Sequence, residues 1–265
     1  MINLANSKVL EGLNDEQLKV ATKIDGKVVV NATAGSGKTF SIVARTANMI
    51  ESGIPAKDIV MFTFTRKAAE EMKARVTAKI GNKAKGMTVS TYHSFCVRLL
   101  RSYISTQGFK RNFSIYDEED KISLITKILD KMKEADSNLK GVKVKDITSR
   151  ISFWKDEMIS YIDAINNTRG DFGIDRIAAD VYEKYFNKMK ECNALDFDDL
   201  IYMAIRILEN NPTVLAQVNN QYRYIIADEA QDSGVRDFRL IQLLAGPDKD
   251  KWNLCLVGDD CQSKL

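Results

Sequence analysis

Short apolar runs alternate with longer amphipathic stretches in two separate blocks of the chain. The first block contains the runs 27–31 (KVVVN), 58–64 (DIVMFTF) and 87–90, and a segment with helical periodicity follows each of them. The second block contains the runs 222–227 (YRYIIA) and 252–257 (WNLCLV). Continuous apolar runs are typical of strands buried on both faces. The pattern therefore predicts an α/β fold with a parallel sheet that is flanked by helices.

A different pattern separates the two blocks. From about residue 107 to about residue 194 the sequence has almost no strand-like run, and it contains charged amphipathic stretches such as 117–134 and 175–191. This pattern predicts a mostly helical insertion subdomain. The predicted organisation is a first part of the α/β domain at 1–106, the insertion at 107–194, and a second part at 195–265.

Composition adds only weak constraints to this picture. The 265 residues are 45% apolar and 28% charged, which is ordinary for a soluble globular protein, and the net charge of +3 allows a nucleic-acid partner without indicating one. No apolar run is long enough to span a bilayer, and the N-terminus lacks the pattern of a signal peptide, so no membrane partner is expected. The four cysteines are scattered. This spacing favours reduced thiols in a cytoplasmic protein over a zinc site or disulfides.

A glycine-rich loop, residues 32–39 (ATAGSGKT), lies directly between a predicted strand and a predicted helix. Gly35 and Gly37 supply conformations that a Cβ would block, so backbone N–H groups and the helix N-terminus can face a phosphate chain. Lys38 would place a positive charge on the β- and γ-phosphates, and the Thr39 hydroxyl can ligate Mg²⁺. The first glycine of the strict pattern is replaced by alanine, and the alternative is a simple turn. The strand–loop–helix context favours the phosphate site.

Acidic residues follow two further predicted strands. Asp228 could hold Mg²⁺ opposite Thr39 of this loop (the P-loop), and Glu229 could activate a water for attack on the γ-phosphate. By itself such a pair often marks only a helix N-terminus. Gln262 could sense the γ-phosphate, with Asp259 and Asp260 nearby, although the same residues could form a polar turn. All these segments follow apolar strands, as a doubly wound sheet with one shared site requires.

Gln17 has two possible roles. Asn14 and Gln17 fit a capping box at the start of a helix, and local geometry alone favours this structural role. The donor–acceptor pair of the Gln17 amide also suits the edge of an adenine base.

The ordered set of motifs resembles the UvrD/Rep/PcrA-like superfamily 1 DNA helicases, and the resemblance covers the whole chain. The matching segments are Leu13-Asn-x-x-Gln17, the Ala-Gly-Ser-Gly-Lys-Thr loop, Phe62-Thr-Phe64-Thr-Arg66-Lys-Ala-Ala, Thr91-Tyr-His93-Ser-Phe, Ser114-Ile-Tyr-Asp117, Leu195-Asp-Phe-Asp-Asp199-Leu, Asp228-Glu-Ala-Gln-Asp232 and Gly258-Asp-Asp-Cys-Gln-Ser263.

This resemblance implies a RecA-like ATP-binding lobe with ATP and Mg²⁺ as cofactors. It assigns adenine recognition to Gln17 and a coupling role to Gln231. Considered individually, an aromatic residue such as Phe64 is more often part of a core, and His93 is more often a structural hydrogen-bonding residue. The nucleotide-binding residues implied are Gln17, Ala34, Gly35, Ser36, Gly37, Lys38, Thr39 and Phe40, the catalytic ones are Lys38, Glu229 and Gln262, and the DNA-binding ones are Phe64, Arg66, Thr91 and His93.

The resemblance further implies an ATP-dependent translocase that moves along single-stranded DNA and unwinds duplex DNA in repair or replication. The family pattern continues beyond Ser263 with a second RecA-like lobe that carries arginine fingers. The 265 residues alone are therefore expected to bind nucleotide weakly and to hydrolyse it little. Two other hypotheses remain open, a stand-alone module that binds ATP or single-stranded DNA, and the helicase subunit of a recombination nuclease.

Overall fold

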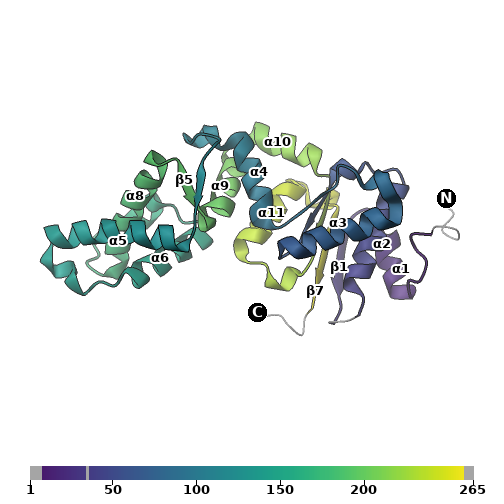
Figure 1. Ribbon diagram of the computed structural model, residues 1–265, viewed down its shortest axis with the longest axis horizontal. Helices are drawn as coiled ribbons and strands as arrows, with labels where there is room; N and C mark the ends of the chain where they lie inside the picture. The colour runs from purple at the N-terminus through teal and green to yellow at the C-terminus, as the bar shows by residue number, and fades with distance from the viewer. Residues whose placement is uncertain (1–7, 34–35, 260–265) are drawn as a thin grey trace. The chain divides into compact units, whose positions relative to one another are not determined.

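The computed structural model describes residues 8–33 and 36–259 of the chain, and these residues form two compact units (Figure 1). The first unit comprises residues 1–95, 211–233 and 237–265, and the second comprises residues 96–210 and 234–236. The domain boundaries predicted at 106/107 and 194/195 both lie inside the second unit. The reason is tertiary, since the residues after 194 pack with the helical unit.

The first unit is built on a parallel five-stranded sheet, which confirms the predicted α/β fold. Its strand order is β1-β7-β6-β2-β3, and every neighbouring pair is parallel. The strands are β1 (Lys27–Asn31), β2 (Ile59–Phe62), β3 (Thr88–Ser90), β6 (Tyr224–Ala227) and β7 (Leu254–Gly258). All five lie on the apolar runs identified in the sequence.

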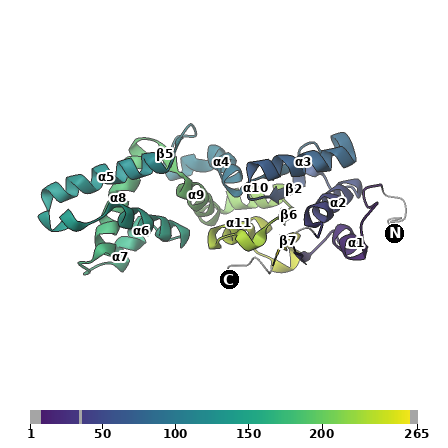
Figure 2. The same cartoon turned by 60° about the horizontal axis from the view of Figure 1, so that its bottom comes forward.

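Helices cover both faces of this sheet (Figure 2). The crossovers from β1 to β2 and from β2 to β3 run in one direction along the sheet, whereas the crossover from β6 to β7 runs in the other. Because such crossovers are right-handed, α2 and α3 cover one face and α11 covers the other. The helices of this unit are α1 (Asp15–Thr22), α2 (Lys38–Glu51), α3 (Arg66–Ile80), α10 (Pro212–Gln221), α11 (Val235–Ala245), the start of α4 (Tyr92–Tyr103), and the 3₁₀ segments Ala56–Asp58, Gly81–Ala84, Ala230–Asp232 and Lys249–Lys251.

Alternate side chains of the strands pack on opposite faces of the sheet. Met61, Ile226 and Cys255 are buried with residues of α2 and α3 in one hydrophobic core cluster. On the other face Phe62 stacks on Tyr92 with ring centroids 4.6 Å apart. The strands are therefore held from both sides, and the loops at their carboxyl ends start from a fixed frame.

Helix α1 is fastened to α2 by a buried arginine. Arg45 of α2 is 2% exposed, and its guanidinium donates hydrogen bonds to the carbonyl oxygens of Val20, Lys23 and Ile24 at the end of α1. These carbonyls have no partner within their own helix, so the arginine supplies the donors that they lack. The contact fixes the position of α1, the helix that carries Gln17.

The second unit is mostly helical, as the sequence predicts. Its elements are α5 (Glu118–Ala135), α6 (Val144–Asp156), α7 (Tyr161–Asn167), α8 (Ile174–Glu191), α9 (Phe197–Asn210), the 3₁₀ segments Ile104–Gln107 and Ser137–Gly141, and the parallel strands β4 (Ser114–Tyr116) and β5 (Ala194–Asp196). The strand pair was not predicted, because three residues are too few to show a periodicity. In the described part of the chain, no helix is both long and apolar enough to cross a membrane.

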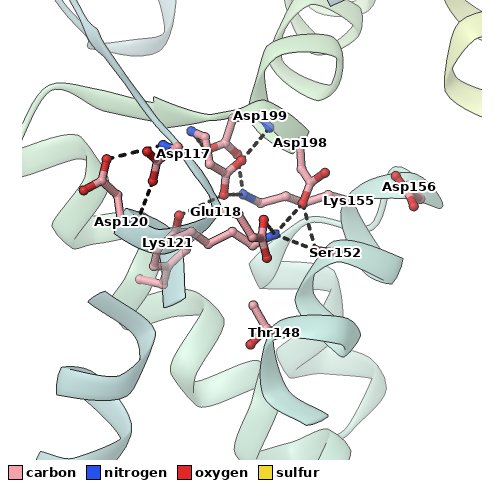
Figure 3. A network of polar contacts seen from close by, with 12 residues as sticks. Asp117, Glu118, Asp120, Lys121, Thr148, Ser152, Lys155, Asp156, Asp198 and Asp199 are labelled. Carbon is pink, nitrogen blue, oxygen red and sulfur yellow. Dashed lines mark hydrogen bonds and ion pairs between the residues drawn. The ribbon is translucent and has the colours of Figure 1, made fainter. Parts of the chain in front are cut away.

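A buried lysine organises the centre of this unit (Figure 3). The Nζ atom of Lys155 lies 2.7 Å from a carboxylate oxygen of Asp196 and 2.7 Å from one of Asp199. The two aspartates also accept each other's backbone N–H, and Tyr185 donates its hydroxyl to Asp196 at 2.8 Å. All four side chains are buried. The network therefore places two carboxyl groups against one buried cation.

A second polar cluster lies beside it and includes a residue far away in the sequence. Asp198 accepts hydrogen bonds from Lys121 at 2.9 Å and from Ser152 at 2.8 Å (Figure 3). Arg236 donates to the backbone carbonyl of Asp198 at 2.9 Å and pairs with Asp156. These contacts explain why residues 234–236 belong to the second unit.

The lysine-centred network shifts the pKa values of its two carboxyl groups in opposite directions. Burial, together with the negative charge of Asp196, raises the pKa of Asp199 to about 7. Burial also acts to raise the pKa of Asp196, but Lys155 outweighs it and holds this pKa at about 2. One lysine thus keeps one of the two carboxylates ionised, while the other favours its protonated form.

We expect an Asp199→Asn variant to lose part of the pH dependence of stability. The folded-state pKa of Asp199 is higher than that of an exposed aspartate, so its contribution to stability is fully present below about pH 4 and is lost as the pH rises through about 7. The free energy of unfolding of the variant should therefore fall less between pH 4 and pH 7, as measured by urea titrations. Asp130→Asn, at an exposed position of α5, is the control. Equal slopes in the variant and the wild type would contradict the assignment.

Candidate functional site

The loop after β1 requires glycine at its last position. Gly37 precedes α2 with φ at 86°, and a Cβ built on it would lie 2.6 Å from the Nε2 atom of Gln17. The left-handed backbone favours glycine, and a Cβ at this position would also displace the Gln17 amide. Ala34 and Gly35, two of the predicted nucleotide-binding residues, lie outside the described residues.

The N-terminus of α2 is open to an anion. The helix begins at Lys38, no side chain caps it, and its first turn holds no acidic residue. The first N–H groups and the positive end of the helix dipole therefore lack a partner of opposite charge on α2 itself. Thr39 lies in this first turn. The ring of Phe40 lies 5.1 Å from the Nζ atom of Lys79 and is 37% exposed.

The acidic pair follows β6, next to the end of β2. The backbone N–H of Asp228 donates to the carbonyl oxygen of Phe62 at 2.9 Å, which extends the sheet pairing by one residue. Glu229 then adopts φ 54° and ψ 42°, a left-handed conformation that is uncommon for a residue with a side chain. Backbone strain of this kind clusters at functional sites, where the surrounding structure holds it in place.

The carboxyl group of Asp228 is buried with little positive charge near it. Burial, followed by the negative charge of Glu229, raises its pKa to about 6, and Lys38 lowers it only weakly. Its Oδ1 atom accepts a hydrogen bond from the backbone N–H of Glu229 at 3.1 Å. A hard oxygen ligand with uncompensated charge suits a divalent cation such as Mg²⁺, and the Thr39 hydroxyl, the metal ligand predicted from the sequence, could supply a second oxygen.

Lys38 connects the three strand ends. Its Nζ atom lies 3.7 Å from a carboxylate oxygen of Glu229 and 4.0 Å from one of Asp259. Lys38 follows β1, Glu229 follows β6, and Asp259 follows β7, which lies between them in the sheet. The crossovers from β1 and from β6 run in opposite directions, so this edge is the switch point where doubly wound folds bind ligands.

Gln231 links the acidic pair to the end of β7. Its amide nitrogen donates to Glu229 at 2.7 Å, and its amide oxygen accepts the backbone N–H of Asp259 at 3.1 Å. A Cβ built on Gly258 would lie 3.0 Å from this amide oxygen. A side chain at this glycine position would therefore crowd the glutamine amide that makes the link. Gln262, the predicted γ-phosphate sensor, lies outside the described residues.

Gln17 has the capping role, and it also contacts the P-loop. Its Oε1 atom accepts the backbone N–H of Asn14 at 3.1 Å, which completes a capping box with the Asn14 side chain. Its Nε2 atom donates to the carbonyl oxygen of Ser36 at 3.1 Å. One amide thus joins α1 to the glycine-rich loop.

A pocket of about 330 Å³ lies beside the P-loop. Gln17, Ser36 and Lys38 are part of its wall, whereas Phe40 is not. The remaining lining residues are Asn14, Glu16, Val20, Val29, Val30, Asn31, Ala32 and Ser41. Polar groups thus stand around a floor that contains apolar residues, the usual composition of a small-molecule site.

The structure brings the predicted DNA-binding residues to one edge of the sheet. β2 and β3 are neighbours, with Phe62 opposite Ser90, so Phe64 and Arg66 follow one strand while Thr91 and His93 follow the other. Phe64 is 59% exposed, and His93 is exposed as well. The Thr91 hydroxyl is held by Ser94, to which it donates at 2.9 Å. An aromatic ring in solvent at this edge differs from the core position that a single phenylalanine usually takes.

Arg45 and the residues Val29 and Val30 were not identified from the sequence. Arg45 has the helical spacing of a core position, and only its burial among helix-end carbonyls shows that it supports α1. Val29 is 76% exposed although it lies within an apolar run, because β1 is an edge of the described sheet. The hydrophobic periodicity of the sequence therefore indicates neither the supporting role of Arg45 nor the exposure of Val29.

The fold and this site define a RecA-like P-loop domain, since a glycine-rich strand–loop–helix lies beside acidic residues at the ends of nearby parallel strands. Residues 13–263 match the UvrD/REP helicase N-terminal domain. The chain belongs to this family, which confirms the resemblance that its motifs indicate.

The relatives are ATP-dependent DNA helicases by name. The chain is 37% identical over 263 residues to the ATP-dependent DNA helicase PcrA of Bacillus subtilis (strain 168), across 99% of this chain and 34% of that protein. It is 36% identical to the ATP-dependent DNA helicase Rep of Escherichia coli (strain K12), across 95% of this chain and 36% of Rep. It is 34% identical to the ATP-dependent DNA helicase UvrD1 of Mycobacterium tuberculosis (strain ATCC 25618 / H37Rv), across 97% of this chain and 34% of UvrD1. The chain thus spans about a third of the length of these curated relatives.

Proposed function

We propose that this chain is the ATP-binding lobe of an ATP-dependent DNA helicase that moves along single-stranded DNA and unwinds duplex DNA, in repair or replication in the cytoplasm. The observation that carries the proposal is the convergence of Lys38, Glu229 and Asp259, which follow three different strands, within 4.0 Å. The relatives are named ATP-dependent DNA helicases, which supports ATP as the nucleotide and DNA as the polymer.

The phosphate chain would lie at the N-terminus of α2. Lys38 would contact the β- and γ-phosphates, and backbone N–H groups of Ser36 and Gly37 would donate to their oxygens. A phosphate group there would compete with Glu229 and Asp259 for the lysine, so nucleotide binding would loosen the contacts that hold the three strand ends together. Ala34, Gly35 and Phe40 remain predictions as nucleotide-binding residues.

Mg²⁺ would be held by Asp228 and Thr39. The uncompensated buried carboxyl group and the helix hydroxyl supply the hard oxygen atoms that this ion prefers. When bound, the ion would neutralise charge on the phosphate oxygens.

Glu229 would act as the general base. The left-handed backbone at this residue and the hydrogen bond from Gln231 hold its carboxylate beside Lys38, where a γ-phosphate would lie. Because the same Gln231 amide accepts the N–H of Asp259, it would pass a change at the γ-phosphate on to the end of β7. Gln262 remains a prediction as the sensor of that phosphate.

Gln17 would recognise adenine from the edge of the pocket. Both ends of its amide make hydrogen bonds within the protein, so reading a base would require one of these bonds to be exchanged. DNA would bind at the edge formed by β2 and β3. A base would stack on the exposed ring of Phe64, with Arg66, Thr91 and His93 beside the strand, which fits sequence-independent tracking.

The test is steady-state ATP hydrolysis and strand displacement by the full-length protein, with and without single-stranded DNA. We expect DNA to stimulate hydrolysis and duplex DNA to be unwound. Residues 1–265 alone should show a turnover lower by about 10³ or more, because the family's arginine fingers lie in a second lobe. Robust DNA-stimulated turnover by the 265-residue chain, or DNA-independent turnover by the full-length protein, would overturn the proposal.

A Gly37→Ala variant is expected to lose nucleotide affinity by at least about tenfold. The added Cβ would lie 2.6 Å from Nε2 of Gln17, so this amide would have to move and its hydrogen bond to the carbonyl oxygen of Ser36 in the loop would be lost. The measurement is the binding of a fluorescent ATP analogue to residues 1–265 in the presence of Mg²⁺.

Gly26→Ala is a matched control for this variant. Gly26 also has φ at 86°, but a Cβ built on it meets nothing within 4 Å. Both variants therefore share the backbone strain, and only Gly37→Ala changes the loop. Similar affinities for the two variants would show that the contact with Gln17 does not matter for binding.

A further inference from the structure

A groove between α5 and α8 in the second unit has a composition unlike that of the nucleotide pocket. Its volume is about 530 Å³. Leu124, Ile128 and Met132 of α5 form its floor at intervals of four residues, so they lie on one face of that helix. Its other lining residues are Ala135 and the lysines Lys127, Lys131, Lys184 and Lys188.

The floor of the groove is an apolar surface that is only partly buried against the core of the unit. Ile125 and Leu129, also on α5, are fully buried in the hydrophobic core of this unit. Leu124, Ile128 and Met132 pack against that core but remain partly exposed. The apolar stripe of α5 is therefore wider than its packing against α6 and α8 requires. A stripe of this kind is typical of a surface that a partner covers.

Four exposed lysines border this floor, two from each helix. Lys127 and Lys131 lie one turn apart on α5, and Lys184 and Lys188 lie one turn apart on α8. Lys188 pairs with Glu191 at 2.8 Å. No ion pair is found for the other three lysines in the described part of the chain. The borders of the groove are thus strongly positive.

We propose that this groove binds an amphipathic helix with acidic flanks, contributed by a partner protein. Aliphatic and methionine side chains suit the apolar face of a docked helix, and the two lysine pairs complement carboxylates on either side of that face. A nucleic acid fits less well, because the lining contains no aromatic ring for base stacking and no arginine. The lining residues of α5 run from Leu124 to Ala135, about 12 residues, which corresponds to a partner helix of about three turns.

The test titrates residues 1–265 with a 15-residue peptide that has Leu at positions i, i+4 and i+7 and Glu on both flanks. In methyl NMR spectra the peptide is expected to shift the signal of Met132, whereas Met189, which is buried in the hydrophobic core of the unit, serves as the internal reference. A scrambled peptide of the same composition should leave the Met132 signal in place. A shift with both peptides, or with neither, would overturn the proposal.

Charge reversal tests the lysine borders. The double variant Lys127→Glu/Lys184→Glu is expected to weaken peptide binding at least tenfold, as measured by fluorescence anisotropy, because both side chains are exposed and their replacement leaves the core intact. Lys140→Glu/Lys145→Glu carries the same change of charge outside the groove and should bind like the wild type. The proposal would be wrong if both double variants lost affinity equally. It would also be wrong if a 15-nucleotide single-stranded DNA bound more tightly than the peptide and lost its binding in the groove variant alone.

Discussion

Replacing Glu229 with glutamine is expected to lower ATP turnover by the full-length protein by about 10²–10⁴-fold, the usual contribution of a positioned general base. The glutamine oxygen can still accept the hydrogen bond from Gln231, so the strained turn after β6 should persist. The amide cannot take a proton from water. Its neutral charge also removes repulsion of the phosphates, so nucleotide affinity should stay the same or increase.

The measurement separates kcat from the dissociation constant of ATP. Glu16→Gln is the matched control, because Glu16 lines the pocket beside Lys38 but is exposed and paired with Lys19 at 2.6 Å. The control should turn over ATP at nearly the wild-type rate. If Glu229→Gln kept a kcat within about threefold of the wild type, Glu229 would not be the base.

Replacing Lys155 with methionine is expected to destabilise the second unit by about 3–5 kcal/mol, the usual cost of breaking a buried ion pair from one side. Methionine has a similar length but leaves Asp196 and Asp199 buried without a cation. Both carboxyl groups would then favour protonation. Part of the lost stability should therefore return when the pH is lowered towards 4.

Thermal and urea unfolding of the 265-residue chain measure this effect. Lys145→Met, at an exposed position on the same helix, is the control and should change stability by less than about 0.5 kcal/mol. A loss of less than about 1 kcal/mol for Lys155→Met, or a loss that does not depend on pH, would contradict the role assigned to the network.

Several parts of the site could be predicted from the sequence because each follows an apolar strand. Asp228 and Asp259 come directly after β6 and β7, and Lys38 stands at the end of the loop that follows β1. Parallel strands present their carboxyl ends at one edge of the sheet. The residues needed for this prediction are local in sequence. Their roles in catalysis and metal binding stay predictions.

The two possible roles of Gln17 could not be resolved in this way. From the sequence, the helix cap and a contact with the nucleotide site are alternative roles. In the structure the Gln17 side chain caps α1 and contacts Ser36 at the same time. Whether one amide can reach both partners depends on where Arg45 holds α1 against α2. That position is a result of packing between helices.

The parallel sheet, the helical insertion, the P-loop and the family could all be predicted from the sequence, because apolar runs, glycine positions and motif order are recognisable in short segments of the chain. The unit boundaries, the β4–β5 pair and the burial of Lys155 between Asp196 and Asp199 are visible only in the folded chain. So is the set of lysines that borders the groove of α5 and α8. Each of these features joins residues that are distant along the chain. Their energies come from burial and from charges brought together, and these do not exist until the chain has folded.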